Sequence, residues 1–110
     1  MIRETIAQIE KRLQNASSMS EQTRLELLGL LGTLRQEVTE LSKTDADRAE
    51  RIAGLADTTT EHATSSSPDP DSFKDSLDSF AGSVDGFENS HPNLVQIVNR
   101  ICTTLSNLGI

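Results

Sequence analysis

Glu88 and His91 have the spacing that comes closest to a known chemical motif in this sequence. On a helix, side chains three residues apart lie on one face. Ferritin-like metal proteins use such a Glu-x-x-His pair from each of two helices, with two further glutamates. A symmetric dimer would supply two copies of the pair. However, Pro92 follows directly, and no second glutamate lies on an apolar face. We therefore expect a surface glutamate and a capping histidine, and keep metal binding as the alternative function.

The other reactive side chains fit no catalytic pattern. Cys102 lies next to Ile101 near an apolar stripe, so we expect a buried thiol that packs as a small hydrophobic group. His62 and Glu61 stand in a polar stretch, and the serines at 65–67 are part of the same stretch. The sequence contains no glycine-rich phosphate loop and no zinc-ligand spacing. We expect a protein without enzymatic activity, and we assign it no cofactor and no metal.

The net charge of the chain and its distribution argue against some classes of partner. The chain has 17 acidic and 10 basic residues and a net charge of −7, with six of the acids between Asp69 and Glu88. An acidic surface repels phosphate backbones and anionic lipids, so we expect neither nucleic acid nor membrane as a partner. The acidic segment either docks a basic partner or stays solvated, and it lacks the EF-hand order of ligands. The single cysteine is typical of a reducing compartment, which indicates the cytoplasm.

The stretch 20–41 contains the strongest structural signal. Its large apolar residues recur at intervals of four and three, which places them on one face of a helix. Leu25, Leu28 and Leu30 widen this face, so other helices must cover it. Gly29 and Gly32 lie within the same stretch, and they indicate the close approach of another helix, a bend or simple tolerance.

A second helix is predicted upstream, at 2–14, from Ile2, Ile6, Ile9 and Leu13. The short polar break at 15–18 makes the two helices antiparallel neighbours. Either Ser18, which forms a capping box with Glu21, or Ser20 caps the helix that follows.

The signal weakens after Leu41. Thr44 or Asp45 caps a third helix with a face of small residues, which is partly exposed or a frayed continuation of the second helix. Polar and proline residues then predict a flexible linker over 58–71. Three domain segments follow: 1–57 (helical hairpin and third helix), 58–71 (linker) and 72–110 (C-terminal amphipathic helices).

Two amphipathic segments make up the C-terminal part. Phe73, Leu77, Phe80, Val84 and Phe87 keep four-three spacing, which predicts a helix over 72–88 that folds by packing or only against a partner. Pro92 then begins a last helix that stops at Gly109. The four-three phase continues across Pro92, as in a kinked continuous helix, but Asn-Ser-His-Pro is a poor helix interior and we expect a break.

The termini resemble an uncharacterised bacterial family of short helical proteins, catalogued as a domain of unknown function. The resemblance depends on His91-Pro92-x-Leu94, on the ending Leu105-x-x-Leu108-Gly109-Ile110, and on the opening Met1-Ile2-Arg3-Glu4-Thr5-Ile6. It implies a small helical protein without an assigned activity, and it brings no catalytic residues.

These patterns together predict an all-α protein, a small helical bundle completed by self-association. With three Phe and no Trp or Tyr, the core must be aliphatic and the chain marginal alone. The expected function is a non-enzymatic interaction module that binds a second copy or another protein. Its predicted surface is made of Leu27, Leu31, Leu34, Val38, Leu41, Leu94, Ile101 and Leu105.

Overall fold

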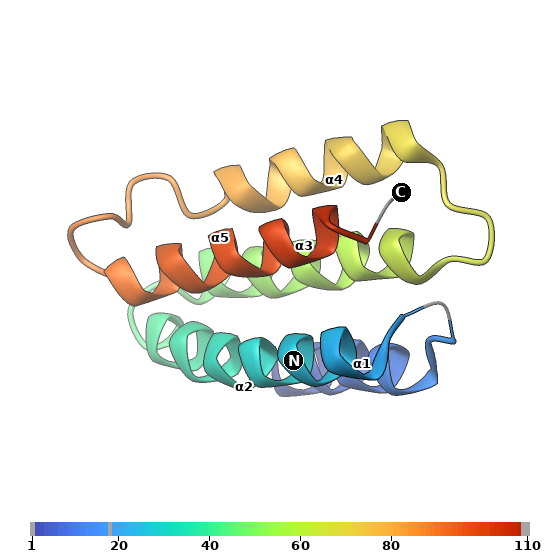
Figure 1. Cartoon of the computed structure of the whole chain (residues 1–110). Helices are drawn as coiled ribbons and strands as arrows, with labels where there is room; N and C mark the ends of the chain where they lie inside the picture. The colour runs from blue at the N-terminus through green and yellow to red at the C-terminus, as the bar shows by residue number, and fades with distance from the viewer. Residues whose placement is uncertain (1, 18, 109–110) are drawn as a thin grey trace.

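The computed structural model describes residues 2–17 and 19–108, which fold into a bundle of five α-helices and no strand (Figure 1). The helices are α1 (Ile2–Asn15), α2 (Glu21–Ser42), α3 (Ala46–Thr64), α4 (Pro70–Gly82) and α5 (Pro92–Ser106). The all-α prediction is therefore confirmed. The four helices α2 to α5 form a ring in which each packs against its neighbours, and α1 packs outside the ring against α2 and α3. One hydrophobic core contains residues of all five helices.

The N-terminal hairpin forms as predicted. Ile6, Ile9 and Leu13 of α1 are buried, and the chain turns within a few residues into α2. Ser20 is the N-cap of α2, and its side chain accepts a hydrogen bond from the backbone N–H of Thr23 at 3.2 Å. Ser18, the competing cap, lies outside the described residues. Arg24 joins the two helices, because its guanidinium donates to the carbonyl oxygens of Leu13 and Ala16 at the end of α1.

The glycines of α2 do not mark a close helix contact. A Cβ atom added at Gly29 or Gly32 would meet no atom within 4 Å. Close approach was therefore the wrong explanation for these residues. Gly29 is exposed and Gly32 half-buried, although both stand within the most apolar part of the sequence. The buried leucines of α2 face the other side of the helix.

Helix α3 corrects the expectation of a weak, partly exposed third helix. It contacts α1, α2 and α4, and Ala49, Ala53 and Ala56 are almost completely buried. Small side chains let neighbouring helix backbones approach closely, so a face without bulk can still lie in the centre of a bundle. Asp45 is the N-cap, with its carboxylate accepting from Arg48 N at 3.2 Å.

The predicted linker at 58–71 was too long. Helix α3 continues to Thr64, and the connection to α4 comprises residues 65–69. Thr59, Thr60 and Ala63 extend the buried face of α3. The hydroxyl of Thr59 donates to the carbonyl of Ser76 in α4 at 3.2 Å, so this buried polar group is satisfied. A threonine-rich stretch can therefore join the core when a buried hydroxyl such as that of Thr59 has a partner.

Replacing Ala53 with leucine is expected to destabilise the fold by about 1–3 kcal/mol, because the added methylene groups have no room between packed helices. Urea denaturation would measure the change. The matched control is Ala46→Leu, in the same helix but exposed, which we expect to be near neutral. Equal effects of the two substitutions would contradict the central position of α3.

The C-terminal half contains two separate helices, α4 and α5, and not the single kinked helix that the four-three phase also allowed. Helix α4 ends at Gly82, and Val84 and Phe87 are buried from a turn rather than from the predicted helix. Gly86 supplies the positive φ of 93° in this turn. The expected break before Pro92 is confirmed, with His91 as N-cap and Pro92 in the first turn of α5. Helix α5 ends at Ser106, and the predicted stop at Gly109 lies outside the described residues.

Candidate functional site

The eight residues predicted to form an interaction surface are core residues of the single chain. None of them is more than 1% exposed, and they hold α2 and α5 within the ring; they are Leu27, Leu31, Leu34, Val38, Leu41, Leu94, Ile101 and Leu105. The chain folds back on itself, so its own helices cover the apolar stripes. The predicted surface must therefore be corrected: these side chains do not face a second molecule.

Glu88 and His91 do not form the arrangement that a carboxylate metal site needs. Both lie in the connection between α4 and α5, so they do not share a helix face. The Glu88 carboxylate accepts from the backbone N–H of Gly86 at 2.8 Å, and the His91 ring lies edge-on to Phe87, with centroids 5.4 Å apart. In residues 2–17 and 19–108, no three His, Cys, Asp or Glu side chains are grouped to hold a metal ion.

Cys102 is a half-buried thiol whose Sγ lies 4.0 Å from the carbonyl oxygen of Leu77. Burial, and secondarily the charge of Asp78, raises its pKa to about 11. The thiol is therefore protonated near neutral pH, whereas nucleophilic chemistry requires the thiolate. Glu61 forms an ion pair with Arg12 of α1, at 3.2 Å between Oε2 and Nη2. Neither Cys102 nor Glu61 belongs to a group of catalytic side chains.

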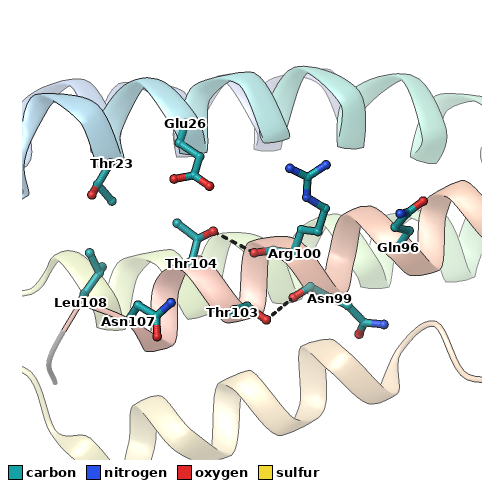
Figure 2. A pocket seen from close by; sticks show the side chains of 9 residues that line it. All are labelled: Thr23, Glu26, Gln96, Asn99, Arg100, Thr103, Thr104, Asn107 and Leu108. Atoms are coloured by element: carbon teal, nitrogen blue, oxygen red, sulfur yellow. Dashed lines mark hydrogen bonds between the residues drawn. The ribbon is translucent and has the colours of Figure 1, made fainter.

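A polar groove between α2 and α5 is one of several concave features on the described surface. One part is a pocket of about 450 Å³ (Figure 2). Its walls are mostly hydroxyl, amide and charged side chains, and Leu108 closes one end; they are Thr23, Glu26, Gln96, Asn99, Arg100, Thr103, Thr104, Asn107 and Leu108. The pocket is lined by residues of α2 and α5 and of the turn that follows α5.

A second pocket of about 210 Å³ extends the groove toward the start of α5. It shares Gln96 and Arg100 with the first pocket, and it is lined also by Leu30, Thr33, Glu37, Asn93 and Ile97. We call the two together the α2–α5 groove. The two helices are antiparallel, since Thr23 lies near the end of α5 and Glu37 near its start.

The side chains of the groove differ in whether their polar groups already have hydrogen-bond partners within the chain. The hydroxyls of Thr103 and Thr104 donate to the carbonyls of Asn99 and Arg100 one turn earlier in α5, at 3.0 and 2.9 Å. Among residues 2–17 and 19–108, by contrast, no hydrogen bond or ion pair engages the side-chain amides of Asn93, Gln96, Asn99 and Asn107, or the charged groups of Glu26 and Arg100. The groove thus presents exposed donors and acceptors that have no partner on the described part of the chain, but no grouped acid, base or nucleophile.

The sequence contained one signal for this groove. Asn93, Gln96, Arg100, Thr103 and Asn107 recur at intervals of three and four, which places polar side chains along one face of α5. Arg100 is also the one Lys or Arg in the last 20 residues. The predicted interaction surface included the apolar residues of this helix and none of these polar ones.

The sequence model of a family described as a domain of unknown function, DUF4404, matches residues 27–110. The chain belongs to the DUF4404 family. The match confirms the resemblance seen at the C-terminus, and it includes all of α5 and most of α2. The matched region begins at residue 27, so it includes neither α1 nor the groove residues Thr23 and Glu26. No curated protein and no solved structure gives a significant match to this DUF4404 protein.

Membrane insertion was not expected for this DUF4404 protein. None of the helices in the described ranges 2–17 and 19–108 combines the length and hydropathy of a transmembrane span.

Proposed function

We propose that this DUF4404 protein is a non-enzymatic binding module that presents the α2–α5 groove to another polypeptide. The observation that carries the proposal is the composition of the exposed side of α5. This side displays amides and hydroxyls and a single charge, at Arg100, in a protein whose residues are 25% charged. Protein interfaces are depleted in charged residues at their centre, and the α5 side of the groove has one charged side chain, Arg100.

The partner in this proposal is a different chain rather than a second copy. Self-association was expected because a single chain was thought unable to bury its leucines. The fold removes that reason, since the leucines of α2 and α5 are covered within one chain. Leu25 is the one large hydrophobic side chain that is mostly exposed among the described residues, and a single exposed leucine needs no partner.

We also place the protein in the cytoplasm. The free thiol of Cys102 supports this location, because a reducing compartment keeps cysteines unpaired.

Site-specific crosslinking in the native cells tests the proposed function. A photoreactive amino acid replaces Thr103 in the groove or, as the control, Thr58, which is exposed on α3 outside it. We expect a discrete heavier adduct from position 103, none from position 58, and loss of the adduct when Arg100→Glu is added.

Equal labelling from both positions, or no adduct from the groove, would refute the proposed binding face. An adduct of twice the mass of the chain would show that the occupant of the groove is a second copy and not a different chain.

A further inference from the structure

The α5 wall of the groove displays four primary amides, on Asn93, Gln96, Asn99 and Asn107. A primary amide has a carbonyl acceptor and an N–H₂ donor side by side. In an extended main chain, the N–H and the C=O of one residue point to the same side and offer the complementary pair. Each of these side chains can therefore form two hydrogen bonds with one stretch of backbone, independently of the bound sequence.

The exposed amides of α5 would interact differently with a helical ligand and with an extended one. In a docked helix the main-chain N–H and C=O groups already bond to one another, so the amides would gain little. In an extended segment these groups are free, and they need partners once water is excluded. The amide row therefore favours an extended segment over a helix.

The length of the groove sets the length of the segment. From Asn93 to Asn107 the α5 wall covers 15 residues, and the 14 steps between its ends span roughly 21 Å at the rise of an α-helix. An extended chain advances about 3.3 Å per residue, so roughly six or seven residues fill the groove.

The charges of the groove add a preference for certain side chains. Glu26 extends from α2 toward α5, and Arg100 extends from α5 toward α2 (Figure 2), without forming an ion pair with each other. Glu37 lies beyond Arg100 in the second pocket, so the order along the groove is negative, positive, negative. A complementary segment has an acidic residue near its centre, which the guanidinium of Arg100 can bind at both oxygens, and a basic residue on each side.

We propose that the α2–α5 groove binds an extended polypeptide segment of about six or seven residues through its main chain. The amides of α5 pair with the backbone of the segment, Arg100 binds its central carboxylate, and Glu26 and Glu37 bind basic side chains that flank it. This inference rests on the proposed function and defines the chemistry of the partner.

Titration of the isotope-labelled protein with a synthetic peptide tests the inference. The probe is a seven-residue peptide, acetylated and amidated, with lysine at both ends, glutamate at its centre, and valine and threonine between them. We expect shifts of the side-chain amide signals of Asn93, Gln96 and Asn99. We expect at least a fivefold loss of affinity for Asn99→Leu and at least tenfold for Arg100→Glu.

Two controls separate main-chain recognition from general stickiness. Gln36→Leu removes an exposed amide of α2 outside the groove and should leave the affinity unchanged. The same peptide with alternate main-chain nitrogens methylated keeps all side chains but loses backbone donors, and we expect it to bind at least tenfold more weakly. Thermal melts of each variant would confirm that the fold is intact.

Equal binding of the methylated peptide would overturn the inference, as would tighter binding of a helical peptide with the same charges. The absence of shifts at millimolar peptide would also overturn it. If groove-specific crosslinks at position 103 are nevertheless found, the binding module stands and only the extended-segment chemistry fails. If those crosslinks are absent as well, the proposed function fails.

Discussion

Replacing Leu34 with alanine is expected to lower the free energy of unfolding by about 2–5 kcal/mol, and by the same amount at every protein concentration. Leu34 is 0% exposed in the core of the single chain, so the substitution leaves a cavity among neighbours that relax only in part. Urea denaturation followed by circular dichroism, at protein concentrations a hundredfold apart, measures both quantities.

Leu25→Ala is the matched control for this substitution, with the same chemical change in the same helix. Leu25 is 61% exposed, so we expect its replacement to change stability by no more than about 0.5 kcal/mol. A stripe buried between two copies would instead make unfolding concentration-dependent. A midpoint that rises with protein concentration would therefore contradict the burial of Leu34 within one chain.

Replacing Phe80 with alanine is expected to cost about 3–5 kcal/mol and to act mainly on α4. Phe80 is completely buried, and Phe73 is the other buried side chain of this helix. A helix held by two aromatic anchors should open locally when one of them is lost. Chemical denaturation gives the loss of stability, and hydrogen exchange shows where it falls. We expect faster exchange in residues 70–82 than in α2.

Lys74→Ala provides the control in α4, because its side chain is exposed and the change should be close to neutral. Uniform acceleration of exchange across all helices after Phe80→Ala would show that α4 does not open separately. No acceleration in 70–82 would show that Phe80 is not its anchor.

Local periodicity was enough to predict most of the helices. Ile6, Ile9 and Leu13 repeat at helical spacing, and a structure with 3.6 residues per turn is the simplest way to bury them together. Pro92 stands in the first turn of α5, where its missing N–H removes no helical hydrogen bond. Signals of this kind depend on neighbouring residues in the sequence and on backbone geometry.

The end of α3 could not be predicted in the same way. Thr59 and Thr60 look like surface residues in the sequence, since threonine is polar and a modest helix former. They are buried because the Thr59 hydroxyl finds the carbonyl of Ser76, 17 residues away, and because α4 covers this side of α3. A hydrogen bond between two helices has no counterpart in local propensity.

For the candidate site, too, some features follow from the sequence and others only from the tertiary structure. Unaided, the sequence determined that the protein is all-helical, which residues are apolar enough to form its core, and that a polar stripe runs along 93–107. Tertiary structure alone decided that the leucines of α2 are covered by helices of the same chain and that Glu26 of α2 and Arg100 of α5 line one groove. The physical reason is that periodicity specifies which face of a helix must be buried. The partner that buries it is chosen by long-range packing of the whole chain.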